Sequence, residues 1–153
     1  MNVRSVLAGV AGIIMKEFNL HILEADSAFY EGPCVSLVVP MPDGLYGVLA
    51  NHINMVAAVS IGDLKYTTPD GDEHFVSVSN GMLRIEDNDV LVLVESAEDP
   101  DEIDYDRAML EMQEAEELLK SEMGRINYKM ASAMVARAMN RLRTKSRYGR
   151  DSK

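Results

Sequence analysis

Cysteine is almost absent from this chain of 153 residues, since Cys34 is the only one. A single cysteine excludes an intramolecular disulfide, and with only three histidines the chain falls short of the donor set of a structural zinc site. Long apolar runs are also absent: the most membrane-like stretch, residues 6–15, is about half of the roughly 20 residues that span a bilayer. These absences favour a reducing, cytoplasmic setting and a protein that does not insert into a membrane.

The motifs of common active sites are missing as well. The sequence has no Gly-x-Ser-x-Gly nucleophile elbow, no Gly-rich phosphate loop ending in Lys-Ser or Lys-Thr, and no Gly-x-Gly-x-x-Gly fingerprint. His21, His52 and His74 are scattered without the spacing of metal ligands, and Cys34 lies in an apolar stretch typical of a core residue. We therefore predict a non-catalytic protein that requires no cofactor and holds no metal.

Negative charge is in excess, with a formal net charge of -10, which argues against a nucleic acid partner. The charge is unevenly distributed in the last third of the chain. Residues 98–123 carry mostly Asp and Glu, whereas residues 125–153 carry mostly Lys and Arg. Each segment can therefore attract the other, or the basic segment can bind an acidic surface elsewhere.

Residues 17–98 have the pattern of a β-sandwich domain. Apolar and polar residues alternate over 18–22 and 76–79, as expected for half-buried strands. The apolar runs 35–39 and 90–94 are nearly continuous, which predicts strands covered on both faces.

Short turn sequences separate these stretches at intervals typical of an antiparallel sandwich: Pro42-Asp43-Gly44, Pro69-Asp70-Gly71-Asp72, Asn80-Gly81 and Asp87-Asn88-Asp89. We expect residues 1–16 to form a loose extension ahead of the sandwich; a cleaved signal peptide is the less favoured alternative.

The periodicity changes after Pro100, which discourages a strand or a helix from continuing through it. We expect an antiparallel helical hairpin over residues 99–145, with a break at Gly124 and Asn127, and a basic tail over residues 146–153. Two apolar stripes recur at alternating steps of three and four residues, the spacing of one helix face: Tyr105, Ala108, Met112, Ala115 and Leu119, then Tyr128, Ala131, Val135, Ala138 and Leu142.

The alanines in these stripes bury little area, so we expect the two helices to be held together only modestly. Two interpretations remain open. The hairpin is either a rigid cap on the sandwich or a marginally closed element that a ligand or a partner opens.

One cluster in the hairpin has the groups needed to bind a nucleotide. A carboxylate, a guanidinium and two apolar side chains lie close together at the start of the first helix and can hydrogen-bond and cover a purine ring: Ile103, Asp104, Arg107 and Ala108. Arg137 and Arg141, four residues apart on the second helix, can bind phosphates bidentately. The simpler interpretation is an intrahelical Asp104–Arg107 pair beside a solvated basic face, which needs no ligand.

The order of several short motifs resembles the epsilon subunit family of bacterial F-type ATP synthase. The residues that carry the resemblance are Gly32, Pro40, Asp43-Gly44, Gly47-Val48-Leu49, Asn51-His52, Gly62, Asn80-Gly81 and Ile103-Asp104-x-x-Arg107-Ala108. The similarity extends from residue 18 to about residue 143, which is nearly the whole chain apart from its two ends.

The resemblance implies a non-catalytic rotor subunit at the cytoplasmic face of the cell membrane. In this family the sandwich binds the gamma subunit and the c-ring and helps to couple ion flow to rotation. The folded hairpin permits activity, whereas the extended hairpin reaches the catalytic alpha/beta head and inhibits ATP hydrolysis. Apart from the resemblance, the polar pair Asn51 and His52 follows residues 44–49 at a loop or strand end and predicts either an ordinary turn or a partner contact, between which the spacing does not choose.

In some members of the family, regulatory ATP binds the folded hairpin. By resemblance, that role falls here on Glu98, Ile103, Asp104, Arg107, Ala108, Arg137 and Arg141. The chain departs from the family pattern at two positions. Glu114 stands where some ATP-binding relatives carry an arginine, and a carboxylate there would repel phosphate. Asn54 stands where the family often has a proline, which changes the loop after His52.

Two alternatives of other classes fit the same residues. One is a free-standing ATP sensor whose hairpin closes on its ligand. The other is a plain scaffold with a rigid hairpin, which would respond neither to ATP nor to a partner.

Overall fold

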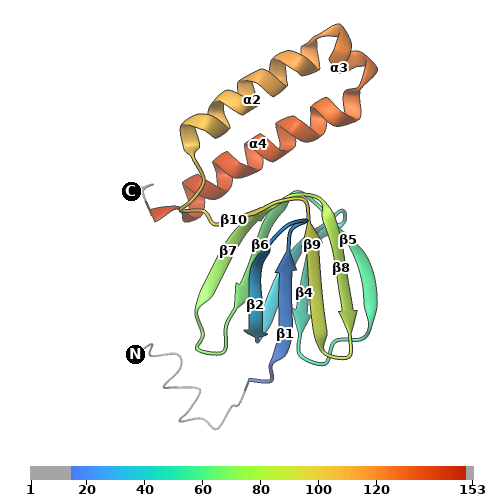
Figure 1. Ribbon diagram of the computed structural model, residues 1–153, viewed down its shortest axis with the longest axis vertical. Helices are drawn as coiled ribbons and strands as arrows, with labels where there is room; N and C mark the ends of the chain where they lie inside the picture. The colour runs from blue at the N-terminus through green and yellow to red at the C-terminus, as the bar shows by residue number, and fades with distance from the viewer. Residues whose placement is uncertain (1–14, 151–153) are drawn as a thin grey trace.

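A computed structural model describes residues 15–150 as a β-sandwich joined to a helical hairpin (Figure 1). Most of the predicted extension (residues 1–14) and the last three residues of the predicted tail (151–153) lie outside the described residues. The strands are β1 (Phe18–Leu23), β2 (Ala28–Cys34), β3 (Ser36–Met41), β4 (Gly44–Leu49), β5 (Met55–Val59), β6 (Gly62–Thr67), β7 (Glu73–Val78), β8 (Gly81–Glu86), β9 (Asp89–Val94) and β10 (Ala97–Glu98); the helices are α2 (Tyr105–Lys120), α3 (Glu122–Ile126) and α4 (Tyr128–Tyr148).

The sandwich consists of two five-stranded sheets, with strand orders β2-β1-β9-β8-β5 and β10-β7-β6-β3-β4. The predicted sandwich is therefore confirmed, and its strands pair antiparallel with one exception. Strand β1 lies between β2 and β9 and runs parallel to β9, with Leu20 opposite Val90. Consecutive strands reverse direction, and β1 and β9 are separated by an even number of strand steps, so the two run the same way.

One of the predicted turn sequences closes a hairpin within a sheet, whereas another lies where the chain crosses between the two sheets. Asp87 and Asn88 both have positive φ, 49° and 65°, which is the backbone of a tight hairpin turn between β8 and β9. Asn80-Gly81 is not a hairpin turn, because β7 and β8 belong to different sheets and the chain crosses between them there. A Cβ on Gly81 would lie 2.0 Å from the carbonyl oxygen of Leu93, so this crossing leaves no room for a side chain.

The core lies between the two sheets and is built from the inward-facing residues of the strands. Leu20, Leu37 and Val92 are completely buried, and Cys34 is buried as expected of a core residue. The expectation that the run 90–94 is covered on both faces is wrong, since Leu93 is 40% exposed. Only one face of each sheet meets the other sheet, so Leu93 lies on the outer face.

The hairpin forms where the apolar stripes predict it, with one addition, although Tyr105 and Tyr128 at the start of the two stripes are exposed. Ala108 and Ala115 of α2 and Ala131 and Ala138 of α4 are buried between the helices. The break contains the short helix α3, which begins after Ser121, where the side chain of Ser121 accepts a hydrogen bond from the backbone N–H of Gly124. Helix α4 continues to Tyr148, so residues 146–148 of the expected tail are helical.

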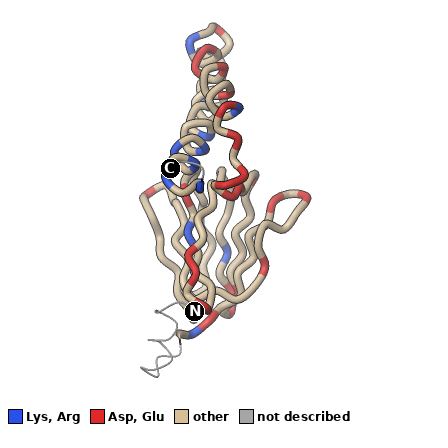
Figure 2. Tube along the Cα trace, turned by 90° about the vertical axis from the view of Figure 1, so that its left-hand side faces the viewer, with Lys and Arg blue, Asp and Glu red and all other residues tan. Residues whose placement is uncertain are grey.

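The hairpin projects from one end of the sandwich, and α4 contacts β6 and β7 there (Figure 1). Acidic residues lie along α2 and basic residues lie along α4, so the two oppositely charged segments of the sequence form two facing helices (Figure 2). None of the helices within residues 15–150 is long and apolar enough to cross a membrane.

Candidate functional site

A groove of about 420 Å³ lies where α2, α4 and the end of the sandwich meet. Three arginines, two glutamates and three smaller or apolar residues line it: Ser96, Glu98, Arg107, Glu111, Met134, Arg137, Ala138 and Arg141. We call it the arginine groove. Four of the residues expected to bind ATP thus lie around one cavity, namely Glu98, Arg107, Arg137 and Arg141.

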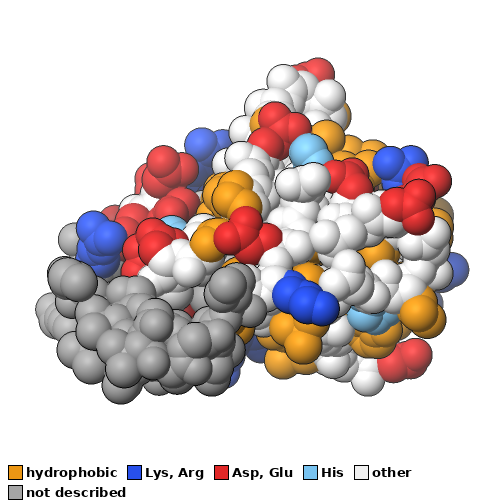
Figure 3. Space-filling model, turned by 90° about the horizontal axis from the view of Figure 1, so that it is seen from below, with side chains coloured by type: hydrophobic (Ala, Val, Ile, Leu, Met, Phe, Trp, Pro, Cys, Tyr) orange, Lys and Arg blue, Asp and Glu red, His pale blue; other side chains and the backbone are white. Residues whose placement is uncertain are grey.

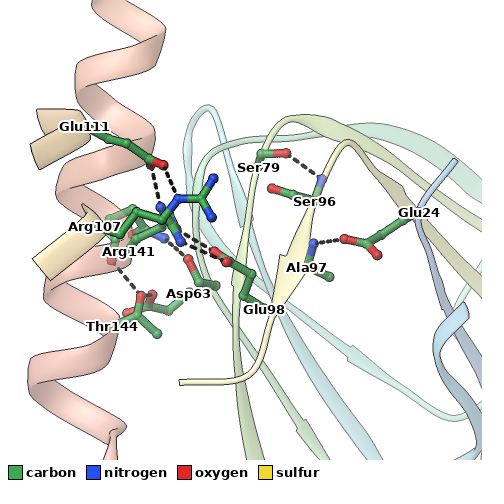
Figure 4. Close-up of polar contacts among 12 residues, drawn as sticks. Glu24, Asp63, Ser79, Ser96, Ala97, Glu98, Arg107, Glu111, Arg141 and Thr144 are labelled. Atoms are coloured by element: carbon green, nitrogen blue, oxygen red, sulfur yellow. Dashed lines mark hydrogen bonds and ion pairs between the residues drawn. The ribbon is translucent and has the colours of Figure 1, made fainter. Parts of the chain in front are cut away.

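Arg141 occupies the centre of the groove and connects three elements (Figure 4). Its Nε and Nη2 donate to the two carboxylate oxygens of Glu98 on β10, at 2.7 and 3.1 Å, and its Nη1 donates to Glu111 on α2 at 2.5 Å. The side chain is only 19% exposed. Burial by itself lowers the pKa of Arg141, but the hydrogen bonds and negative charges of Glu98 and Glu111 outweigh burial and raise it.

The other two arginines of the groove also face carboxylates. Arg107 donates from Nε to Glu111 at 3.1 Å, one helical turn further along α2, although its side chain is 73% exposed. Arg137 lies 3.6 Å from Glu95. Each arginine of the groove is therefore paired with a carboxylate of the chain itself, and Glu111 contacts two of them.

The remaining residues expected at a nucleotide site point elsewhere. Ile103 and Ala108 are buried and do not line the groove, so neither offers an open apolar face to a purine in this closed arrangement. Asp104 is the N-cap of α2, and its carboxylate accepts the backbone N–H of Arg107 at 3.1 Å. The intrahelical contact of Asp104 therefore involves the backbone of Arg107, while the guanidinium of Arg107 turns to Glu111.

Sequence reasoning missed Glu111 and drew attention to Glu114 instead. Glu114 is exposed and does not line the groove, whereas Glu111 lies inside it. The sequence does indicate a contact between Glu111 and Arg107, because residues four apart on a helix are neighbours and Glu111 follows Arg107 at that spacing.

The contact between α4 and the sandwich is largely polar, which the sequence analysis also missed. Asn140 is 1% exposed, and its Nδ2 donates to the carbonyl oxygen of Gly62 and to Oγ of Ser77, both at 3.0 Å. The hydroxyl of the buried Thr144 donates to the carboxylate of Asp63 (Figure 4). We call Asn140 and Thr144 the polar latch.

Beyond the polar latch, the end of α4 is fixed by two further contacts. Lys145 donates from Nζ to the carbonyl oxygen of Asp101 at 3.1 Å. The ring of Tyr148 stacks on Phe75 with 3.9 Å between centroids. The last turns of α4 therefore lie against the sandwich, whereas the hairpin tip is distant from it (Figure 1).

Asn51 and His52 lie at the opposite end of the sandwich from the hairpin, in the turn after β4. Asn51 has a φ of 61°, and its backbone N–H donates to Oδ1 of Asn88 at 2.7 Å. His52 contacts the carbonyl oxygen of Ile53 through Nδ1 at 2.8 Å and the hydroxyl of Tyr46 through Nε2 at 2.9 Å. A carbonyl oxygen only accepts, so Nδ1 carries the proton and Nε2 accepts from Tyr46 in the neutral ring.

The loop after His52 is closed by Asn54. Its Oδ1 accepts the backbone N–H of Asp87 at 3.0 Å. Leu49, Ile53 and Val56 around this loop are exposed apolar residues, with Ile53 at 76%. From this end, hydrophobic side chains lie among acidic and basic ones on the part of the surface that is not drawn in grey (Figure 3).

Comparison with known proteins covers both parts of the chain. Residues 17–100 match the beta-sandwich domain of the ATP synthase delta/epsilon chain, and residues 101–146 match its long alpha-helix domain. The chain belongs to the ATP synthase delta/epsilon family. The epsilon chain of Ruminiclostridium cellulolyticum is 35% identical over 133 residues, which cover 87% of this chain and 98% of the relative. That of Symbiobacterium thermophilum is 36% identical over 130 residues, covering 84% and 93%.

Solved structures of two mitochondrial ATP synthases contain chains with the same fold. A chain of the Euglena gracilis mitochondrial ATP synthase OSCP/F1/c-ring assembly aligns with a TM-score of 0.67 at 21% identity, covering 80% of this chain and 79% of that one. A chain of the Tetrahymena thermophila central stalk and c-ring assembly aligns with a TM-score of 0.58 at 11% identity, covering 83% and 97%. As a member of the family, the chain is an epsilon-type subunit of an ATP synthase.

Proposed function

We propose that the chain acts as a non-catalytic regulator within the rotor, where it couples ion translocation to ATP synthesis and inhibits ATP hydrolysis. The observation that carries the proposal is the match of both domains to the delta/epsilon chain, from residue 17 to residue 146. Its partners are the gamma subunit, the c-ring and, when the hairpin extends, the catalytic alpha/beta head. The subunit works as a peripheral component at the cytoplasmic face of the cell membrane.

The sandwich is the part that binds the rotor partners. The exposed side chains of Leu49, Ile53 and Val56 form an apolar surface around the turn of Asn51 and His52. Apolar groups that stay exposed in a monomer are typical of a protein interface, and the rigid turn holds them in fixed positions.

The hairpin is the part that regulates. Its contact with the sandwich depends on hydrogen bonds of Asn140 and Thr144 and on the ion pair of Arg141 with Glu98. The distal part of the hairpin is held by the seam between α2 and α4, where Ala115 and Ala131 are buried. Hydrogen bonds can be exchanged for those of another surface with little net change in free energy, so a polar contact suits a helix that docks in two places.

We assign regulatory ATP to the arginine groove. Its volume of about 420 Å³ falls in the range of about 300 to 1,000 Å³ that is typical of small-molecule sites. Arg107, Arg137 and Arg141 would hold the phosphates, and Glu98 would keep Arg141 oriented. Ile103 and Ala108 would reach the base only after the first turn of α2 shifts.

Assembly with partners of the same species tests the rotor role. The full chain and a chain lacking residues 128–153 are each reconstituted with the gamma subunit and the c-ring, and ATP hydrolysis by the complete enzyme is measured. We expect both chains to assemble, because the partner surface lies on the sandwich, and hydrolysis to rise when the basic helix is removed. Failure of the full chain to assemble would refute the rotor role; equal hydrolysis by both enzymes would refute inhibition by the hairpin.

A further inference from the structure

Glu111 lies where a phosphate group would bind in the arginine groove. One of its oxygens accepts from Nε of Arg107 at 3.1 Å, and the other accepts from Nη1 of Arg141 at 2.5 Å. It thus bridges the two helices of the hairpin with a single negative charge. Oxygen anions of phosphate use the same guanidinium donors as carboxylates.

The two glutamates on Arg141 have different effects. Glu98 takes Nε and Nη2 and belongs to β10, so it ties α4 to the sandwich. Glu111 takes Nη1, the donor that faces α2, and it is held beside Arg107 by the spacing of four residues on the same helix. A phosphate that is to contact both arginines must therefore displace Glu111 and not Glu98.

We propose that Glu111 is an internal anion that closes the hairpin without nucleotide and sets how tightly phosphate-bearing ligands bind the arginine groove. The inference rests on the assignment of ATP to this groove. Because Glu111 is part of the chain, it occupies the arginines without any cost of association, whereas ATP must first break two charge-assisted hydrogen bonds. The hairpin of this chain is then closed at rest, and ATP adds less to its closure than it would in a groove that lacks Glu111.

The test compares Glu111→Gln with Glu114→Gln in the isolated full chain. Both substitutions remove one negative charge from α2 and keep the size of the side chain, but only Glu111 lies in the groove. Binding of ATP, with and without magnesium, is measured by calorimetry, and tripolyphosphate serves as a probe without a base. Closure in the absence of ligand is measured by hydrogen exchange of the α4 amides.

Glu111→Gln should bind ATP and tripolyphosphate at least about tenfold more tightly than the unmodified chain, and its ligand-free α4 amides should exchange about tenfold faster. Glu114→Gln should match the unmodified chain in both measurements. The proposal is overturned if the two variants behave alike, if α4 exchange is unchanged in Glu111→Gln, or if neither chain binds either ligand. The last outcome also removes the assignment of ATP to the groove, but it leaves assembly and inhibition of hydrolysis untouched, because those are measured in the complete enzyme.

Discussion

The side chain of Asn140 offers the most direct way to loosen the hairpin without altering the sandwich. Asn140 is buried where α4 meets the end of the sheet, and its amide donates to Gly62 and Ser77 on the interior strands β6 and β7. In Asn140→Ala both hydrogen bonds are lost. Alanine favours helices more than asparagine does, so α4 itself should remain helical.

The expected weakening follows from these two contacts. A hydrogen bond contributes about 1 kcal/mol net, and a buried acceptor that loses its partner costs about 1–3 kcal/mol. Ser77 is also buried, so its hydroxyl has little access to water. We therefore expect docking of α4 to weaken by about 2–4 kcal/mol, which corresponds to a shift of roughly 30-fold to 1,000-fold in the docking equilibrium.

Hydrogen exchange followed by mass spectrometry measures this shift segment by segment. In Asn140→Ala, amides of α4 should exchange faster by up to this factor, while amides of β1 and β9 in the core should keep their protection, because the sandwich has its own core. Met139→Ala is the matched control, since Met139 is adjacent on α4 but exposed.

Two results would refute the reasoning. If α4 exchange in Asn140→Ala equals that of Met139→Ala, the polar latch does not hold the hairpin. If the strands lose protection together with α4, the hairpin and the sandwich unfold as one unit and the hairpin cannot leave by itself.

Two further predictions concern the sandwich. His21 contacts Glu31 through Nδ1 at 3.0 Å and Asp89 through Nε2 at 3.1 Å, and these carboxylates raise its pKa above 6.5. The stabilisation by the ion pairs of protonated His21 is therefore complete below about pH 6 and is lost as the pH rises through the folded-state pKa. His21→Gln should lower the free energy of unfolding by up to about 1 kcal/mol at pH 6 and leave it unchanged at about pH 9. Urea unfolding at both pH values checks this. Gly81→Ala should lower stability by about 3 kcal/mol, because its Cβ would meet the backbone of Leu93, and an unchanged melting temperature would contradict the steric argument.

Much of the fold was predictable because it depends on local patterns. The alternation over residues 18–22 and the helical spacing of the alanine stripes are properties of short segments, and the structure contains β1, α2 and α4 where these patterns lie. The prediction for the run 90–94 was wrong because a continuous apolar sequence is compatible with a strand that is covered on one face as well as with one covered on both. That difference depends on the neighbouring layers and not on the strand.

The sequence by itself determined the two-part architecture, the helix registers and the arginines available for an anion. These features depend on periodicity, turn residues and charge, which are properties of short segments of the chain. Only the tertiary structure decided which partners those arginines have. Glu98 and Glu111 meet Arg141 across 43 and 30 residues of sequence, and Asn140 meets Gly62 across 78. Contacts at such separations depend on how the helices dock on the sandwich, which no local pattern specifies. The pair of Glu111 with Arg107 follows from helical spacing, whereas its contact with Arg141 exists only because α2 and α4 lie side by side.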